Sequence, residues 1–248
     1  MIKLITLDLD NTLWDIDPVI VSAEKKMRAW ITEHIPEAIA FMELDRIKGT
    51  YKQLVKQHPE LSHHPTQLRK RILYHAFIEA NVPTETAKMH SEDAFQIFYK
   101  ERNRITLFHQ AETVLHRISQ NFPIIALSNG NANLELIGID HFFTAHFSAE
   151  TEGKPKPHNN MFLKALELTG VLPQETIHVG DHAEEDINAA KALGFHTIWF
   201  NQDNMQDENL CQPTLMIHQI TQLPEAISRI NQSVTGSTDS KKTPVNPG

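Results

Sequence analysis

Short apolar runs recur along this chain, and their alternation with helical segments constrains the fold more than any other feature. The runs lie at residues 2–7, 124–127, 146–148, 176–179, 197–200 and 215–217. After Thr113 they are separated by segments whose apolar residues recur at helical spacing. Strands that alternate with helices form parallel sheets whose two faces are both covered. The sequence therefore predicts an α/β fold with a doubly wound parallel sheet, which binds ligands at the carboxyl ends of its strands.

A long helical stretch interrupts this alternation early in the chain. From Pro18 to about residue 104, apolar residues recur at helical spacing and no strand pattern is seen. Breaks divide the stretch into four or five predicted helices, at Pro36, Gly49, 58–65 and 81–84. We therefore predict a core made of residues 1–15 and 105–231, with a helical subdomain inserted at residues 16–104.

Composition and charge narrow the class of protein. Apolar residues make up 40% and charged residues 22% of the chain, as in ordinary globular proteins. The net charge of -8 provides no basic field for a nucleic-acid backbone or an anionic membrane surface, so neither partner is expected. Residues 232–248 are mainly Ser, Thr, Lys, Pro and Gly, which predicts a disordered tail.

The cellular location is inferred from two features. Cys211 is the single cysteine, so an internal disulfide is excluded and a reducing compartment is the default. The apolar run before Asp8 is too short for a signal peptide or a membrane span. We expect a cytoplasmic protein.

Two aspartates follow the first predicted strand. Alternate residues of an extended segment point the same way, so the carboxylates of Asp8 and Asp10 can converge on one site. Two carboxylates that close need a cation between them or a shared proton. Paired aspartates after a strand are also common in simple turns.

The next two polar segments offer groups that bind anions. Ser128 and the backbone amides that follow it, beginning with Asn129, can bind an anion, although Ser-Asn-Gly is also a common turn. Lys154 lies between a glycine and a proline, which directs its ammonium group from a non-helical loop. That group can neutralise a phosphoryl group, and a solvent-exposed basic loop is the alternative.

A fourth polar segment follows the run at 176–179. Asp181 lies in the loop where a hard oxygen ligand for Mg²⁺ would be placed. The acidic residues after it stabilise the first turn of a helix, which accounts for Glu184, Glu185 and in part Asp186.

Taken in order, the four segments resemble the four motifs of the haloacid dehalogenase superfamily. The matching strings are Asp-Leu-Asp-Asn-Thr, Leu-Ser-Asn-Gly, Gly-Lys-Pro-Lys-Pro, and His-Val-Gly-Asp followed after four residues by Asp186. The resemblance covers about residues 1–15 and 105–220. It implies a Rossmann-like core whose helical insert is a cap between the first and second motifs.

The resemblance also implies roles for the motif residues. Asp8 would be the nucleophile that attacks phosphorus, and Asp10 would protonate the leaving alkoxide and then activate the attacking water. Phosphate oxygens would be bound by Ser128, the Asn129 amide and Lys154. Lys154, rather than Lys156, matches the lysine before the first proline of the third motif.

The same resemblance implies Mg²⁺ as the cofactor. Its ligands would be Asp8, the main-chain carbonyl of Asp10, and Asp181. Asp186 would bind the ion directly or through water, or would be oriented toward Lys154.

The expected activity is hydrolysis of a small phosphomonoester through an aspartyl-phosphate. Asp10 distinguishes phosphatases of this superfamily from its dehalogenases, which need no proton for a leaving alkoxide. The strings Leu-Ser-Asn-Gly-Asn-Ala and Asp-Leu-Asp-Asn-Thr-Leu-Trp-Asp resemble a bacterial branch with flavin mononucleotide and riboflavin-pathway phosphatases. Alternatives are a nucleotide or sugar-phosphate phosphatase, a phosphotransferase or mutase, and a non-catalytic module that binds a phosphorylated ligand. The sequence does not distinguish a monomer from a homodimer.

The cap is expected to close over the core and to contact the leaving group. Candidate contact residues are Trp14, Tyr51, Arg69, Arg71, Tyr74 and Arg102. Packing at the hinge is the alternative for Trp14, and a solvent-exposed helix face is the alternative for Arg69 and Arg71.

Overall fold

The described part of the computed structural model, residues 1–206 and 211–239, contains one six-stranded sheet. The strands pair in the order β3-β2-β1-β4-β5-β6, and every neighbouring pair is parallel. Their bounds are β1 Leu4–Leu7, β2 Ile124–Ser128, β3 Ala145–Ser148, β4 Thr176–Gly180, β5 His196–Phe200 and β6 Leu215–Ile217. The predicted doubly wound parallel sheet is confirmed.

The central strand is β1, and its surroundings explain its unbroken apolar sequence. Ile5 pairs with Ile124 of β2 on one side and with Ile177 of β4 on the other. All residues of β1 are buried, because both faces of a parallel sheet are covered by helices. The carboxyl ends of β1, β2 and β4 therefore lie side by side at one edge of the sheet.

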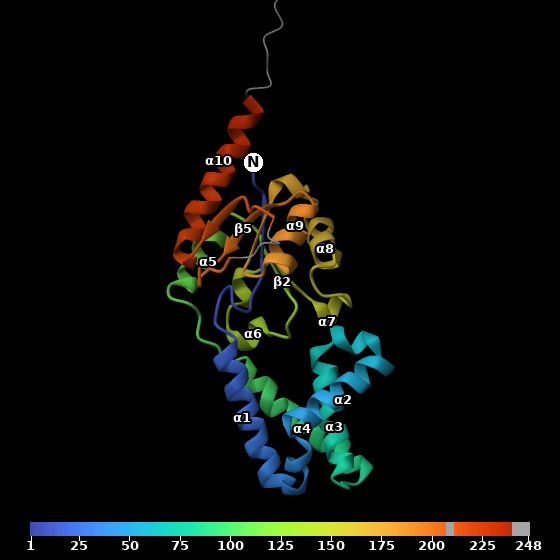
Figure 1. Ribbon diagram of the computed structural model, residues 1–248. Coiled ribbons are helices and arrows are strands. Elements are labelled where there is room, and N and C mark those ends of the chain that lie inside the picture. The colour runs from blue at the N-terminus through green and yellow to red at the C-terminus, as the bar shows by residue number, and fades with distance from the viewer. Residues whose placement is uncertain (207–210, 240–248) are drawn as a thin grey trace, which may run out of the picture.

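Helices cover the two faces of the sheet (Figure 1). On one face, α5 (Ala111–Ser119) and α10 (Leu223–Asp239) pack against Ile5, Leu7 and other strand residues. On the opposite face, α8 (Asn160–Thr169) and α9 (Ala189–Ala192) pack against Leu4 and its neighbours. The short elements of the core are α6 Leu134–Ile137, η3 Asp140–Phe142, α7 Ala149–Glu152, η4 Pro173–Glu175, η5 Ala183–Asn188 and η6 Ile220–Gln222.

The inserted segment forms a helical lobe below the sheet in Figure 1, and we call this lobe the cap. Its helices are α1 Asp17–His34, α2 Leu44–Gln57, α3 Pro65–Glu79 and α4 Thr84–Arg102, with short 3-10 helices at Pro36–Phe41 and Pro59–His63. The cap has its own apolar core, which includes Met27, Ile31, Phe77, Phe95 and Phe98. The predicted break at Gly49 is wrong, because α2 continues through it. A single glycine costs a helix only about 1 kcal/mol relative to alanine, which tertiary packing offsets.

The two crossings between cap and core lie together. Trp14, in the crossing into the cap, forms an antiparallel bridge with Leu107 in the crossing back to the core. The Phe108 amide donates to the Leu13 carbonyl at 2.8 Å. Trp14 is fully buried at this hinge. Its surroundings therefore match the alternative of packing at the hinge.

The end of the chain differs from the predicted tail. Helix α10 continues to Asp239, so residues 232–239 are helical where disorder was expected. The helix is held on the core by buried Ile227 and Ile230, and Val234 extends this contact past the predicted boundary. Residues 240–248 of the predicted tail lie outside the described residues. No helix in the described ranges is long and apolar enough to cross a membrane.

Candidate active site

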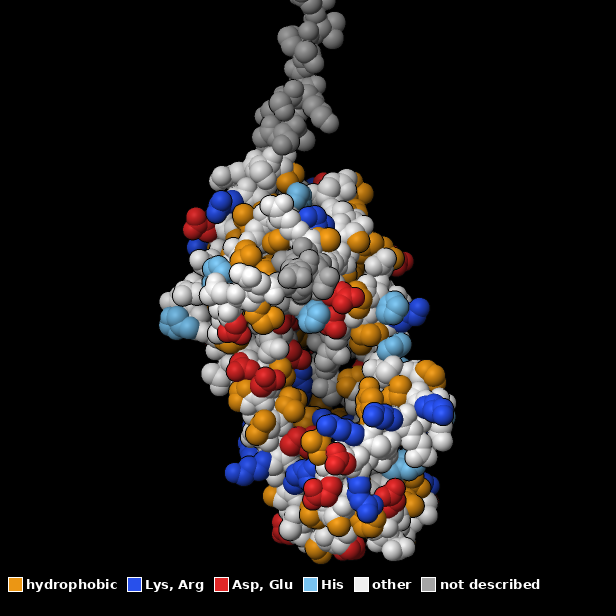
Figure 2. Space-filling view, in the orientation of Figure 1, with side chains coloured by type: hydrophobic (Ala, Val, Ile, Leu, Met, Phe, Trp, Pro, Cys, Tyr) orange, Lys and Arg blue, Asp and Glu red, His pale blue; other side chains and the backbone are white. Residues whose placement is uncertain are grey.

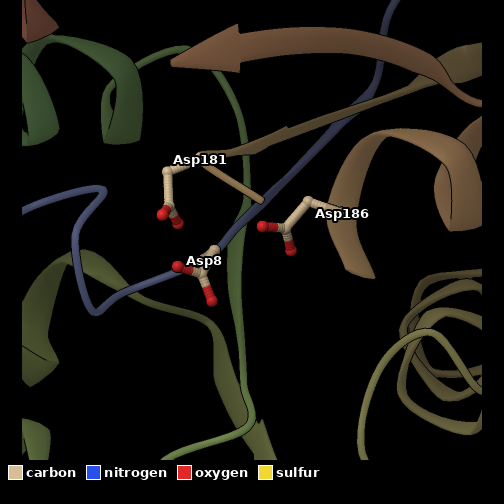
Figure 3. Close-up of side chains that lie close together, drawn as sticks. All are labelled: Asp8, Asp181 and Asp186. Atoms are coloured by element: carbon tan, nitrogen blue, oxygen red, sulfur yellow. The ribbon is translucent and has the colours of Figure 1, made fainter. Parts of the chain in front are cut away.

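Three aspartates from two distant segments of the sequence meet at the carboxyl edge of the sheet (Figure 3). Asp8 follows β1, Asp181 follows β4, and Asp186 lies in the π-helical segment Ala183–Asn188. One oxygen of each carboxylate lies within 4.8 Å of those of the other two. The main chain holds Asp8 through an amide hydrogen bond to the Val179 carbonyl of 2.9 Å, so the sheet itself sets this geometry.

A small cavity opens at this cluster, with a volume of about 160 Å³. It is lined by Asp8, Asp10, Asn11, Ser128, Asn129, Gly130, Asp181, His182, Glu185 and Asp186. The structure thus brings together every predicted site residue except Lys154.

The lysine at the site is Lys156, which corrects the prediction of Lys154. Lys156 is 2% exposed, and its Nζ lies 2.6 Å from Asp8 Oδ1 and 2.5 Å from Asp186 Oδ1. Lys154 is exposed to solvent on the same loop. Both lysines precede a proline, so the local string does not distinguish them.

Asn129 explains why the loop presents Lys156. Its side-chain Oδ1 accepts from the Lys156 amide at 2.7 Å, and its Nδ2 donates to the Lys156 carbonyl at 2.9 Å. The same Nδ2 lies 2.8 Å from Glu185 Oε2. The side chain of Asn129 therefore holds the loop, whereas its main-chain amide was the group predicted to bind phosphate.

Burial and charge shift the pKa values of this cluster in opposite directions. Burial raises the pKa of Asp8 well above its ordinary value, and the charges of Asp186 and Asp181 add to this against the pull of Lys156. Burial opposes the charge of Lys156, but the Asp186 and Asp8 carboxylates raise its pKa above the ordinary value. Burial likewise opposes the charge of Asp186, yet Lys156 and His178 hold the pKa of Asp186 well below its ordinary value. Lys156 and Asp186 thus form a buried ion pair beside Asp8.

Asp181 is the one of the three carboxylates that is only partly buried. Burial and the nearby charge of Asp186 raise its pKa to about 6. The Thr12 hydroxyl lies 3.3 Å from Asp181 Oδ1 and 3.1 Å from Asp8 Oδ2, so it can donate to either. Trp199 Nε1 donates to the Asp181 carbonyl at 2.8 Å, which holds the loop in place.

His178 also lies at the site, although the sequence predicted no role for it. It is fully buried on β4, with Nδ1 2.9 Å from Thr6 Oγ1 and Nε2 3.1 Å from Asp186 Oδ1. Burial lowers its pKa, which keeps the ring neutral. A neutral ring that donates to Asp186 accepts from Thr6, so His178 orients the Asp186 carboxylate. A polar residue inside an otherwise apolar strand run was the signal that could have revealed it.

The side chain of Asp10 faces the cap. Its carboxylate accepts from Arg102 Nη2 at 2.7 Å and from Trp14 Nε1 at 2.8 Å. The atom of Asp10 that is predicted to bind Mg²⁺ is its main-chain carbonyl oxygen. That assignment stays a prediction.

The end of β2 supplies the predicted anion-binding groups. Ser128 is buried, and its hydroxyl accepts from the Gly130 amide at 3.0 Å. This contact closes a tight turn over the same cavity that Asp8 lines.

The aspartate cluster fits a hard divalent cation, since Mg²⁺ prefers carboxylate oxygens. Raised pKa values at Asp8 and Asp181 mean that two negative charges lack full compensation there. Both oxygens of Asp186 already accept hydrogen bonds, from Lys156 and His178 at Oδ1 and from the His182 amide at Oδ2. Both oxygens of Asp8 also accept hydrogen bonds, from Lys156 and Thr12, so these contacts alone do not separate Asp8 from Asp186. The raised pKa values of Asp8 and Asp181 and the lowered pKa of Asp186 favour the first two as direct ligands and Asp186 as the anchor of the lysine.

A larger cavity of about 400 Å³ lies between the cap and the core. Figure 2 shows a hollow at the junction of the two lobes. Among the predicted leaving-group contacts, Tyr51, Arg69 and Arg102 line this cavity, whereas Arg71 and Tyr74 do not. From the core, Asp10, Gly130 and Asn131 line it, so it adjoins the residues beside the aspartate cluster.

The comparisons with known proteins agree with this geometry. The haloacid dehalogenase-like hydrolase family matches residues 2–194. The chain is 30% identical over 205 residues to the 5-amino-6-(5-phospho-D-ribitylamino)uracil phosphatase YigB of Escherichia coli (strain K12), covering 82% of this chain and 85% of that protein. It is 26% identical over 214 residues to a glyceraldehyde 3-phosphate phosphatase of Methanopyrus kandleri, covering 84% of this chain and 87% of that one.

One similar solved structure is described as a 2-haloacid dehalogenase from Pseudomonas syringae pv. Tomato DC3000. It superposes with a TM-score of 0.89 and 32% identity, over 92% of this chain and 99% of that one. The family match spans the motifs at Asp8, Ser128 and Asp181, which the structure brings to one edge of the sheet. The chain therefore belongs to the haloacid dehalogenase-like hydrolase family and is an enzyme of that family.

Proposed function

We propose that this enzyme is a Mg²⁺-dependent phosphomonoester hydrolase that works through an aspartyl-phosphate. The arrangement of three side chains carries the proposal. Asp8 lies against the buried Lys156, and Asp10 lines the same small cavity as Asp8. A nucleophilic carboxylate, a fixed cation and a second carboxylate for proton transfer are the groups that such hydrolysis requires.

In the first half of the reaction, an Asp8 oxygen attacks phosphorus and the bond to the leaving oxygen breaks. Asp10 donates its proton to that oxygen, so the product leaves as an alcohol. Repulsion between the carboxylate and the phosphate dianion opposes the attack, and the ammonium group of Lys156 offsets it while stabilising the equatorial oxygens.

In the second half, Asp10 takes a proton from a water molecule that attacks the phosphorus of the aspartyl-phosphate. The bond between phosphorus and the Asp8 oxygen breaks, which releases phosphate and restores the carboxylate. Ser128 and the Asn129 amide bind phosphate oxygens in both halves, in line with their place at the end of β2.

The residues that would hold Mg²⁺ are Asp8, the Asp10 carbonyl and Asp181. When bound, the ion supplies positive charge that lowers the repulsion between the nucleophile and the phosphate. Asp186 holds Lys156 in place, which is supported by their 2.5 Å contact.

The substrate class that we propose is a small phosphorylated metabolite, with riboflavin-pathway phosphates and flavin mononucleotide as the leading candidates. The name of the E. coli relative supports the first of these. The cavity of about 400 Å³ has room for a leaving group of that size. In that cavity the guanidinium of Arg69 lies 3.7 Å from the centre of the Phe98 ring. Nucleotides and sugar phosphates are the alternative substrates, and a phosphotransferase or mutase is the alternative reaction.

A second candidate is dehalogenation, which the similarity to the P. syringae structure favours. A halide leaves without a proton, whereas an alkoxide needs an acid. Asp10 lines the active-site cavity and is held by Arg102 and Trp14, which supports the phosphatase over the dehalogenase. We also propose a cytoplasmic location, which rests on the single cysteine of the chain.

The first experiment compares the wild-type enzyme with Asp8→Asn. The panel contains flavin mononucleotide, the ribitylaminouracil phosphate, nucleotides, sugar phosphates and 2-chloropropionate, each assayed with Mg²⁺ and with EDTA. We expect phosphate release that needs Mg²⁺ and disappears in Asp8→Asn.

Chloride release without phosphate release would establish the dehalogenase instead. Transfer of phosphate to an added sugar in preference to water would indicate a phosphotransferase. Full phosphatase activity of Asp8→Asn would contradict the aspartyl-phosphate mechanism.

A further inference from the structure

Arg102 lies where the cap returns to the core, at the last residue of α4. It is 1% exposed and is one of the largest fully buried side chains in the described ranges. A buried arginine is destabilising unless its charge is paired, so its partners indicate why it lies there.

The partners of Arg102 come from the active-site edge of the core. Its Nη2 donates to Asp10 Oδ1 at 2.9 Å and to Asp10 Oδ2 at 2.7 Å. Its Nε donates to Asn131 Oδ1 at 3.0 Å. Because Trp14 Nε1 also donates to Asp10 Oδ1, the carboxylate of Asp10 is held from two directions.

Gly130 leaves the space that this pair occupies. A Cβ atom at position 130 would lie 2.5 Å from Asp10 Oδ2 and 3.1 Å from Arg102 Nη2. A residue with a side chain at position 130 would therefore clash with the ion pair, and either the turn or the pair would have to move. The turn after Ser128 is thus shaped around the Asp10–Arg102 contact.

One end of the guanidinium group remains without a partner. Nη1 of Arg102 is buried, and no group in residues 1–206 or 211–239 accepts a hydrogen bond from it. Leaving a buried donor unpaired is destabilising, and more so when the group is charged. Arg102 lines the cavity of about 400 Å³ together with Asp10 and Asn131, so a ligand oxygen in that cavity is the available acceptor.

We propose that Arg102 has two functions in the hydrolysis of phosphomonoesters, and this inference rests on the proposed phosphatase function. Through Nη2 it is a positioning residue that orients Asp10 toward the leaving oxygen. Through Nη1 it is a specificity-determining residue that donates to a hydroxyl or carbonyl oxygen of the leaving group. The favoured substrates are therefore phosphates of oxygen-rich alcohols rather than of plain alkyl chains.

The test of the positioning function uses Arg102→Lys, which keeps the charge but shortens the side chain and removes Nη2, the nitrogen that donates to both oxygens of Asp10. The value of kcat/KM reports the step that forms the phosphoenzyme, and it is measured with two esters. p-Nitrophenolate leaves without protonation, whereas the alkoxide of propanol needs an acid. We expect kcat/KM to fall on the order of 10²-fold for propyl phosphate and less than about threefold for p-nitrophenyl phosphate.

The test of the specificity function compares glycerol 3-phosphate with propyl phosphate, which lacks the hydroxyl groups. The wild-type enzyme should prefer glycerol 3-phosphate by about tenfold, as expected for a buried donor left unpaired by the poorer substrate. Arg102→Lys should lose this preference. Arg46→Lys is the matched control, because Arg46 is an exposed arginine of the cap that pairs with Glu79 and does not line this cavity.

Equal losses for both leaving groups at an unchanged melting temperature would overturn the positioning function. An unchanged preference for glycerol 3-phosphate in Arg102→Lys would overturn the specificity function. If Arg102→Lys does not fold, Asn131→Leu removes the acceptor of Nε and should show the same leaving-group dependence at smaller size. A wild-type enzyme that releases no phosphate from any ester would instead contradict the proposed function itself.

Discussion

Lys154 and Lys156 lie two positions apart and have opposite surroundings. Lys156 is buried between Asp8 and Asp186, and its backbone is held at both polar atoms by Asn129. Lys154 is exposed. A fixed ammonium group beside the proposed nucleophile can stabilise transition-state charge, whereas an exposed one is screened by water.

We expect Lys156→Met to lower kcat by about 10²–10³-fold, as for removal of one preorganised group that stabilises charge. The matched control is Lys154→Met, which should stay within about twofold of the wild type, as solvent screens an exposed charge. Steady-state kinetics on the best ester of the panel checks both. Thermal unfolding of each variant separates lost chemistry from lost stability, since Lys156→Met leaves two buried carboxylates without their cation. A larger loss for Lys154→Met would restore the assignment made from the motif.

At the scale of elements, the first and last helices of the cap are joined by Glu101. This α4 residue accepts from Ser22 Oγ at 2.9 Å and from Lys26 Nζ at 2.6 Å, both on α1. Its side chain is 11% exposed, whereas that of Lys26 is 49% exposed. The next residue is Arg102, so the packing of α4 on α1 also fixes the arginine that reaches Asp10.

The hydrogen bond from Lys26, together with that from Ser22, lowers the pKa of Glu101 below its ordinary value of 4.5. A group whose pKa is lowered in the folded state adds to the free energy of unfolding at pH values above its ordinary pKa. This contribution is lost as the pH falls through the pKa of the folded state. We therefore expect Glu101→Gln to destabilise the protein by about 1 kcal/mol at neutral pH. The difference should shrink as the pH falls below 4.5. Urea unfolding of both proteins between about pH 7 and pH 3 measures it. A difference that grows on acidification would contradict the assignment.

At the scale of the whole molecule, the cap contacts the core at a second place besides the hinge. The amide and hydroxyl of Thr66 on α3 donate to Glu150 Oε1 at 2.6 Å and to Oε2 at 2.9 Å. Asn131 Nδ2 donates to the same hydroxyl at 3.1 Å, and its Oδ1 accepts from Arg102. Contacts at the hinge and at α3 together enclose the cavity between the two lobes.

Folding and cation binding should be coupled, because folding brings Asp8, Asp181 and Asp186 together. We expect Mg²⁺ at about 100 times its Kd to stabilise the folded enzyme by about 2.7 kcal/mol. For a chain of this size, each kcal/mol raises Tm by roughly 2–4 °C. Thermal unfolding with Mg²⁺ and with EDTA measures the shift, and EDTA should reverse it. Asp181→Asn should lose the shift, and an equal shift in that variant would place the cation elsewhere.

Much of this enzyme was determined by local sequence. A strand whose two faces are both buried is an unbroken apolar run, and this physical requirement revealed the strands of the sheet. Parallel strands end at one edge, so polar residues directly after those runs, such as Asp8, Ser128 and Asp181, had to come near one another. These features depend on neighbours in the chain, and a single sequence contains them.

Only the tertiary structure decided between residues with the same local surroundings. The choice of Lys156 over Lys154 depends on Asn129, a residue from another strand end. The contact of Arg102 with Asp10 depends on where the cap returns to the core. The continuation of α10 past residue 231 is supported by packing of Val234 against the core. Such contacts join residues far apart in the chain, and periodicity or turn propensity carries no information about which distant side chain will be met.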